Sequence, residues 1–318
     1  TNMSKKSKCN VYFKKDTIVE AIKDELDTTG KCPSVNADGS VNVASAESEN
    51  SLLCSAPDNY GTSYYYRGNV SNNYVYFANF YWRIVRINGD GSVRMIYDGT
   101  VAHANAEASE DRIIGTSAFN ENHDDNAYVG YMYGTPGSST YEETHVNIND
   151  STIKKYVDNW YENNLKGTNF EQYLADNLFC NDRSFSASNI GTGIGRSQTN
   201  FRVSNDINAI LICKKFNDMF TVKKSTFGNG NLNYKISIIS SDEVKLSGGY
   251  NNDNLKFYLF NGIYYWTLSP YAYKDYSMTL TVSNYGRSNI GHFVGNKFGV
   301  KPVINLKQGS LKQGDGSI

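Results

Sequence analysis

Four histidines and five cysteines are the side chains of this 318-residue chain best suited to catalysis or metal binding. A nucleophilic hydrolase needs a nucleophile, a base within hydrogen-bonding distance and a group that orients the base. The histidines His103, His123, His145 and His292 lie in none of the motifs typical of such enzymes or of zinc proteases. The cysteines form no C-x-x-C pair. The sequence therefore favours a non-catalytic protein with no metal and no cofactor.

Two polar segments have an alternative interpretation as cation sites. The carboxylates within residues 122–126 (NHDDN) could bind a cation, but a turn stabilised by its own polar groups is the favoured interpretation. The segment 88–91 (NGDG) lacks the ligand spacing and closing glutamate of an EF-hand loop, and it is typical of a hairpin turn. Paired carboxylates for glycoside hydrolysis are defined by their distance in the fold, and the sequence singles out no such pair.

The cysteines favour an exported protein. Cys180 and Cys213 flank one loop-rich insert and form the best candidate disulfide. Cys9, Cys32 and Cys54 all lie in the N-terminal segment, where two could pair and one would remain. Five reduced thiols in a cytosolic protein is the alternative.

The net charge and the hydropathy of the chain limit the kinds of binding partner that we expect. The formal net charge is -1, which gives no electrostatic reason to expect nucleic acid or an anionic membrane. No apolar run reaches the roughly 18 residues that a membrane-spanning helix needs, so we expect no direct membrane span. The first residues lack the apolar segment of a signal peptide. A chain trimmed of an N-terminal anchor and a chain soluble from the start both fit this pattern.

Periodicity predicts an α+β protein. Segments rich in aromatic residues predict strands at residues 64–67, 74–78 and 80–87. The clearest predicted hairpin is formed by residues 80–87 and 92–97. Helical spacing predicts helices over 150–161 and 170–178, and a short one beginning at residue 17. Residues 36–49 are small and polar, like a linker or a peripheral hairpin. The predicted organisation is an N-terminal extension (1–58), one ligand-binding domain (59–308) and a tail (309–318).

The C-terminal interval 264–306 combines two kinds of composition. Residues 264–270 (YYWTLSP) and 299–306 (GVKPVINL) are apolar, and we expect them to be packed β-structure. Between them, residues 271–298 are rich in Tyr, Phe, Ser, Asn and Gly. Tyrosine supplies large contact area at low entropic cost, while Ser, Gly and Asn adapt their hydrogen bonding. A stiff frame with such an interior is typical of a binding surface. The three tryptophans, Trp82, Trp160 and Trp266, are instead expected to pack in the core.

Five segments together resemble the variable proteins of diversity-generating retroelements, and in particular a large exported group from gut bacteria. They are YYYRG (64–68), WRIVRINGDG (82–91), DNAYVGYMYG (125–134), WTLSP (266–270) and GVKPVINL (299–306). The resemblance covers residues 59–308 and implies a C-type lectin-like fold, related to that of formylglycine-generating enzymes, with a C-terminal ligand-binding face. Those enzymes use a cysteine pair near the C-terminal end of the domain, and this chain has no cysteine beyond Cys213.

In that family, residues of the binding face are varied by error-prone copying at adenines, often in AAC codons. Randomised AAC codons cannot encode Lys or Met, so Lys274, Met278 and Lys297 are assigned to the scaffold. The resemblance implies these ligand-binding residues: Tyr271, Tyr273, Tyr276, Tyr285, Arg287, Asn289, His292, Phe293, Asn296 and Phe298.

The sequence thus predicts a recognition protein at the cell surface that binds a protein or glycan on another cell, a phage or a host. Two other classes stay open. One is a pilin-like or other structural surface subunit, in which the N-terminal segment would mediate assembly. The other is a glycan-acting enzyme, which would show perturbed carboxylates or histidines in a pocket joined to this face.

Overall fold

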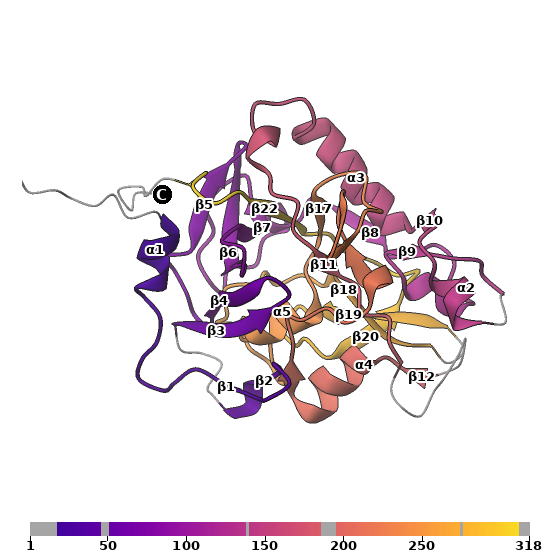
Figure 1. Cartoon of the computed structure of the whole chain (residues 1–318), viewed down its shortest axis with the longest axis horizontal. Helices are drawn as coiled ribbons and strands as arrows, with labels where there is room; N and C mark the ends of the chain where they lie inside the picture. The colour runs from indigo at the N-terminus through magenta and orange to yellow at the C-terminus, as the bar shows by residue number, and fades with distance from the viewer. Residues whose placement is uncertain (1–17, 46–50, 138–139, 186–194, 274–275, 312–318) are drawn as a thin grey trace, which may run out of the picture.

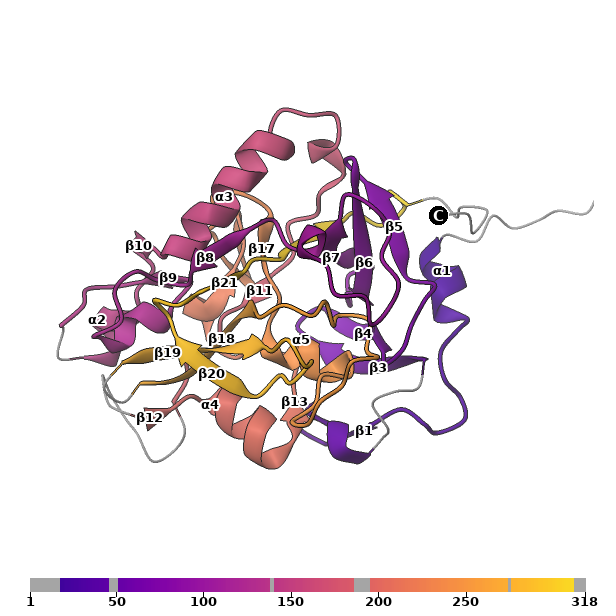
Figure 2. The same cartoon turned by 180° about the vertical axis from the view of Figure 1, so that it is seen from behind.

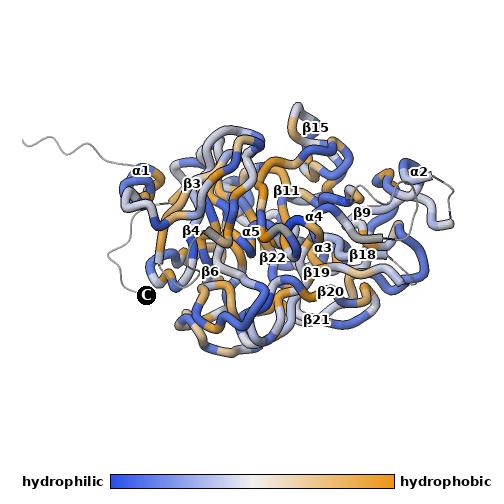
Figure 3. The backbone as a smooth tube through the Cα atoms, turned by 90° about the horizontal axis from the view of Figure 1, so that it is seen from below, coloured by the Kyte–Doolittle hydropathy of each residue, from blue (hydrophilic) through white to orange (hydrophobic). Residues whose placement is uncertain are grey.

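The computed structural model describes residues 18–45, 51–137, 140–185, 195–273 and 276–311. It has the predicted mixed α+β architecture, with two main β-sheets, short helices around them and further short strand pairs (Figure 1). Apolar segments lie mainly inside and polar segments mainly in the outer loops (Figure 3).

The larger sheet among the described residues has seven strands, in the order β17-β22-β7-β6-β4-β3 with β5 paired to β6. All its pairs are antiparallel. The strands are β3 (Leu52–Asp58), β4 (Gly61–Arg67), β5 (Tyr74–Phe77), β6 (Phe80–Ile87), β7 (Val93–Gly99), β17 (Ile236–Ile238) and β22 (Pro302–Leu306). The β6–β7 hairpin was predicted from its 88–91 turn, and the structure confirms it.

The second sheet has the order β20-β19-β18-β21-β8, with β12 paired to β18. The β18–β21 pair is parallel and the others are antiparallel. The strands are β8 (Thr116–Ala118), β12 (Gly195–Arg196), β18 (Tyr265–Tyr273), β19 (Ser277–Val282), β20 (Ile290–Phe293) and β21 (Lys297–Gly299). This sheet contains most of the interval that the sequence marks as a binding surface.

Shorter strands form small sheets: β1 (Ser34–Val35), β2 (Val41–Asn42) and β13 (Asn208–Ala209) make one, and the remaining pairs are β9 (Met132–Tyr133) with β10 (Asn149–Asp150), β11 (Phe179–Cys180) with β14 (Met219–Phe220), and β15 (Lys224–Ser225) with β16 (Gly228–Asn229).

The α-helices are short apart from α3: they are α1 (Ile18–Lys23), α2 (Tyr141–His145), α3 (Thr152–Asn164), α4 (Gln198–Asn200) and α5 (Ser241–Leu246). One-turn 3-10 segments lie at Val43–Ser45, Glu110–Arg112, Asn126–Val129, Glu171–Tyr173 and Phe216–Asp218, and Phe201–Asp206 forms a π-helical turn.

Helix α3 begins where its sequence predicts. The Ser151 side chain accepts a hydrogen bond from the backbone N–H of Lys154 and so caps the first turn. Ile153, Val157 and Tyr161 are buried on one face, and α3 packs beside β8 and β17 (Figure 2). Its apolar face therefore closes one side of the main core.

The second predicted helix, over 170–178, does not form. Only Glu171–Tyr173 is helical, as a single 3-10 turn, and the chain then runs extended. Leu174 is fully buried and forms an isolated β-bridge with Leu306 of β22, and Ala175 N–H donates to the Asn305 carbonyl. Pairing with the sheet replaces the helical hydrogen bonds, so the helix-like spacing of apolar residues is misleading here.

The N-terminal segment is joined to the domain rather than peripheral to it. The predicted boundary between 58 and 59 falls inside the β3–β4 hairpin. In the segment expected to be a linker or a peripheral hairpin, β1 and β2 do form a hairpin. It is not peripheral, because Val41 and Val43 are buried and β2 also pairs with β13 from a distant part of the chain. A Cys32–Cys54 disulfide fixes this segment to β3. Because its apolar side chains complete a small core with Leu211 and Leu246, residues 32–45 and 51–58 are part of the same fold.

The predicted Cys180–Cys213 disulfide is present and closes a loop with a sequence separation of 33. Replacing both cysteines with serine is expected to lower the free energy of unfolding by about 2–4 kcal/mol, because the open chain gains conformational entropy on unfolding. Guanidinium denaturation monitored by circular dichroism measures this change. An unfolding midpoint equal to that of the native chain would contradict the prediction.

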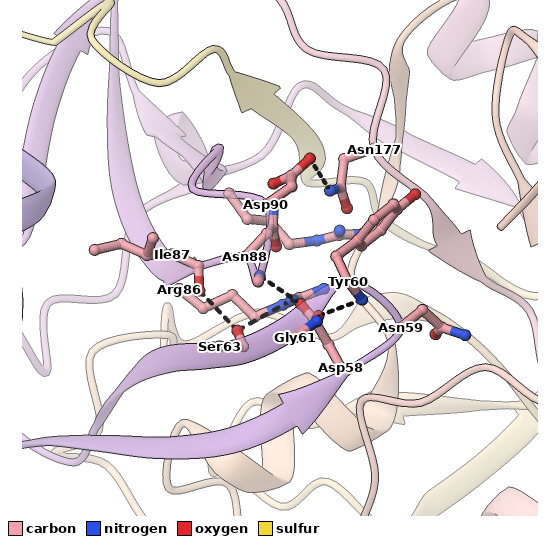
Figure 4. A network of polar contacts seen from close by, with 12 residues as sticks. Asp58, Asn59, Tyr60, Gly61, Ser63, Arg86, Ile87, Asn88, Asp90 and Asn177 are labelled. Carbon is pink, nitrogen blue, oxygen red and sulfur yellow. Dashed lines mark hydrogen bonds and ion pairs between the residues drawn. The ribbon is translucent and has the colours of Figure 1, made fainter. Parts of the chain in front are cut away.

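A buried polar network ties the larger sheet to α5, which lies between the two sheets (Figure 1). Figure 4 shows the part of this network around Asp58 and Arg86. Arg86 of β6 contacts Asp58 of β3 at 2.8 Å and Glu243 of α5 at 3.1 Å. Arg94 of β7 contacts the same Glu243 oxygen at 2.7 Å. Asp58 also accepts hydrogen bonds from the backbone N–H groups of Gly61 and Gly89. These contacts fix the hairpin turns and α5 relative to one another.

The 88–91 segment is a hairpin turn held by its own side chains, as the sequence favoured. Asp90 accepts hydrogen bonds from Ser92 N–H at 2.9 Å and from the Asn177 amide at 3.0 Å, the second of which is drawn in Figure 4. Asn88 donates to Ser92 and to Asn305 of β22. The side chains of this turn thus form hydrogen bonds with other groups of the same protein.

Candidate functional site

The candidate site is the face formed by β18, β19, β20, β21 and the turns between them (Figure 2). Its frame is buried: Trp266 and Leu268 of β18 and Leu280 and Val282 of β19 are at most 1% exposed. The indole N–H of Trp266 donates to the Ser117 carbonyl of β8 at 2.8 Å. Aliphatic packing and this hydrogen bond hold the backbone that carries the face.

All ten residues expected to bind ligand retain contact with solvent, and none is buried. The exposed ones are Tyr276, Tyr285, Arg287, Phe293 and Asn296, and the half-buried ones are Tyr271, Tyr273, Asn289, His292 and Phe298. Of the scaffold assignments, Met278 is half-buried, Lys297 is exposed, and Lys274 lies outside the described residues. Exposure therefore does not distinguish the ten residues from Met278 and Lys297, and the buried frame beneath them consists of other residues of β18 and β19.

One aromatic cluster joins β20 and β21. The Phe298 ring lies 4.7 Å from His292 and 5.2 Å from Tyr264, measured between centroids, and it contacts the buried Trp266 at 5.0 Å. Thr281 of β19 lies within hydrogen-bonding distance of His292 Nδ1, at 3.1 Å. Burial lowers the pKa of His292, which favours its neutral form. This cluster offers flat aromatic surface and a neutral imidazole.

A second aromatic group includes Phe293, the residue of β20 that follows His292. Tyr276 and Phe293 are 44% and 45% exposed, and their rings meet at 5.1 Å. The His123 ring lies 4.9 Å from Tyr276. The main chain holds this arrangement, because Ser277 N–H donates to the His123 carbonyl at 2.7 Å. Exposed, paired aromatic rings of this kind are well suited to contact a partner.

Tyr271 covers the backbone of β20. A Cβ atom built on Gly291 would lie 2.2 Å from the Tyr271 ring, so only glycine lets the ring lie against the strand. Tyr273 reaches in another direction, and its hydroxyl donates to the Asp124 carbonyl at 2.9 Å. These two neighbouring tyrosines thus contact different parts of the fold.

The turn before β20 forms a third part of the face. Tyr285 is 54% exposed, and Gly286 has a positive φ of 76°. Arg287 contacts Asp253 at 2.5 Å, but both side chains are about half exposed, so the pair adds little stability. Ser288 N–H donates to the Tyr250 carbonyl and anchors the turn.

The residues that contact the predicted set without being members of it include Tyr264, His123 and Asp253. Tyr264 begins the first apolar segment, where core packing was expected, yet it is only half-buried. His123 and Asp253 are far in sequence from the residues they contact, so composition gave no signal for them. The acidic segment 122–126 also proves to be a turn. Asp125 caps the Asn126–Val129 segment and accepts from Gly137 N–H at 2.7 Å.

The side chains of this face suit non-covalent contact: aromatic rings, amides, an imidazole and one guanidinium. Among the residues that the structure describes, no group of three or more His, Cys, Asp or Glu side chains is arranged to hold a metal ion. Within the same residues, no helix is long and apolar enough to cross a membrane.

Comparisons with protein-family models, with characterised proteins and with solved structures give no match to this chain. The class that the geometry defines is an α+β protein with two disulfides and an accessible aromatic-polar face on a buried sheet.

Proposed function

We propose that this chain is an exported, non-catalytic recognition protein with a C-type lectin-like scaffold, of the kind diversified by retroelements. It binds a protein or glycan through the face formed by residues 271–298. The observation that carries this proposal is the separation of the ten accessible residues from a frame that is at most 1% exposed. Side chains on such a face can change without removing core contacts.

The location follows from the same features. Disulfides persist in oxidising compartments, and two are formed here, one of them holding the N-terminal segment to the domain. An extracellular or cell-surface location fits this chemistry.

A triple substitution tests the proposal directly. Replacing Tyr276, Tyr285 and Phe293 with serine removes three exposed aromatic contacts, so the free energy of unfolding should fall by less than about 2 kcal/mol. Binding to ligands found by screening the native chain against arrays of surface glycans and surface proteins should be lost. Thermal melts and surface plasmon resonance measure the two effects. Unfolding of the triple variant, or unchanged binding, would count against this face.

The genetic part of the proposal has an independent test. The neighbourhood of the gene should contain a reverse transcriptase and a near-copy of the 3′ end that differs at adenines. Without these elements, retroelement diversification would be rejected, while ligand binding by the face would still be decided by the triple substitution.

A further inference from the structure

A cavity of about 350 Å³ lies between the β4–β5 connection and the loop that follows β7. It is formed by elements other than those that carry the candidate face. Two basic side chains, Arg83 and His103, line it together with Asn69, Ser71 and Asn105, and its described lining contains no carboxylate. The cavity wall is mainly apolar, with a few polar side chains and the guanidinium of Arg83 placed along it.

Arg83 is buried at the wall of this cavity, and its hydrogen bonds are incomplete. Nη2 donates to the Val70 carbonyl at 2.9 Å and to the Asn105 side-chain oxygen. The guanidinium stacks on the Tyr74 ring at 3.9 Å. Nε and Nη1 have no hydrogen-bond partner among the described residues. A buried guanidinium with unused donors favours an additional acceptor nearby.

The carboxylate that faces Arg83 is shared with two other cations. Asp98 lies 4.0 Å from Arg83 Nε, 2.9 Å from Arg112 Nε and 3.3 Å from Lys301 Nζ. All four side chains are at most 1% exposed. Burial lowers the pKa of Lys301 to about 7, but the two arginines remain charged. Asp98 alone cannot neutralise two arginines, and Glu107 of the loop after β7 adds a second negative charge close to Arg112.

The nearby acidic side chains are already engaged. Glu107 and Asp111 lie 2.7 Å and 2.9 Å from the two ring nitrogens of His103. Glu107 also accepts from Ala104 N–H, and Asp111 from Thr100 N–H. These contacts brace the loop from within, so both carboxylates are used by the loop and not by Arg83.

Asn105 occupies the position where an anionic oxygen would interact with Arg83. Its side-chain oxygen accepts from Arg83, and its amide donates to Asn69 at 2.8 Å and to the Val70 carbonyl at 2.7 Å. A neutral carboxamide satisfies a guanidinium less well than a carboxylate does. A ligand carboxylate that displaces the Asn105 oxygen would gain a charge-assisted hydrogen bond from Arg83 Nη2.

We propose that this cavity binds an acidic monosaccharide of the uronic acid type, with its carboxylate at Arg83 and its hydroxyl groups at Asn69 and Ser71. The volume exceeds that of a lone oxyanion, and amide and hydroxyl side chains match the donors and acceptors of sugar hydroxyls. This inference does not depend on the function proposed for the C-terminal face.

Calorimetric titration with sodium glucuronate, glucose and acetate at constant ionic strength tests the proposal. Glucuronate should give saturable binding at concentrations up to about 50 mM, and both glucose and acetate should bind at least about tenfold more weakly. Equal binding of glucose would reject the role of the carboxylate. Equal binding of acetate would reject the sugar, and no saturable binding of glucuronate would reject the site.

Two variants locate the binding. Asn105→Asp places a carboxylate on Arg83, so it should weaken glucuronate binding by about tenfold or more without lowering the melting temperature. Asn169→Asp makes the same charge change at an exposed residue outside the cavity and should leave binding unchanged. Ser71→Glu, at an exposed residue of the cavity, should also weaken binding, and it decides the question if Asn105→Asp does not fold. Unchanged affinity in the folded cavity variants would overturn the assignment.

Discussion

Replacing Trp266 with alanine is expected to lower the free energy of unfolding by about 3–5 kcal/mol. The side chain is fully buried, and its ring packs against Phe119 and Phe298 at centroid distances of 5.9 and 5.0 Å. The substitution would leave a cavity between the sheet and its neighbours. It would also remove the donor to the Ser117 carbonyl, which joins β18 to β8. Urea denaturation followed by far-ultraviolet circular dichroism measures the loss.

The matched control is Tyr285→Ala, in the same interval of the chain. Tyr285 is 54% exposed, so its removal should change stability by no more than about 0.5 kcal/mol. Similar losses in the two variants would mean that frame and face are not energetically separate. That result would remove the physical basis for a face that tolerates substitution.

Trp266 also connects stability to recognition. Phe298 rests on its ring, and His292 contacts Phe298 at 4.7 Å. The cluster of His292 and Phe298 therefore has a fixed support beneath its rings. Preorganised side chains lose less entropy on binding, so under the proposed function we expect this support to raise the affinity without touching the ligand.

Local features of the sequence were sufficient to predict several elements. The 88–91 turn specifies the β6–β7 hairpin, because its polar side chains form the turn themselves. Ser151 and the apolar positions 153, 157 and 161 specify α3. Trp82 and Trp266 are in the core as expected, and the Cys180–Cys213 pair is formed. Each of these predictions depends on neighbours in sequence or on a strong residue preference.

The errors arise where a distant segment decides the outcome. Leu174 has helical spacing, but its backbone pairs with Leu306, 132 residues further along the chain. Val41 lies among small polar residues, yet it is buried because β13 pairs with β2. A pattern within a few residues contains no information on such distant pairing partners. For this reason the sequence did not predict the burial of Val41 or the extended chain after Tyr173.

The candidate face also contains contacts between residues that are far apart in the sequence. The interval 271–298 was chosen from its composition, and its role as a binding face stays a prediction. The contact of His123 with Tyr276 could not be predicted from the sequence, because 153 positions separate the two residues. The cavity beside Arg83 likewise depends on the β4–β5 connection, β6 and the loop after β7 meeting in space.

The largest electrostatic effect is expected at Glu243, and Glu243→Gln should lower the free energy of unfolding by about 3–5 kcal/mol. The carboxylate contacts Arg86 and Arg94 inside the protein, and its other oxygen accepts from Ser240 N–H at 3.1 Å. Neutral glutamine keeps the shape but leaves two buried guanidinium groups with only Asp58 as an anion. Glu142→Gln, an exposed residue with the same change, should have almost no effect.

The pH dependence separates this loss of charge from a loss of packing. Burial acts to raise the pKa of Glu243, but Arg94 and Arg86 outweigh it and hold the pKa below its usual value of 4.5. A group with a lowered folded pKa stabilises the protein above its unfolded pKa, and that contribution is lost as the pH falls through the folded pKa. The native chain should therefore lose stability below about pH 4.5, with Glu243 contributing up to about 1.4 kcal/mol per pH unit. Denaturation between pH 7 and pH 3 should show a shallower acid slope in Glu243→Gln than in Glu142→Gln. Equal slopes would show that Glu243 gains no stability from its ionised form, and the buried network would then act through shape alone.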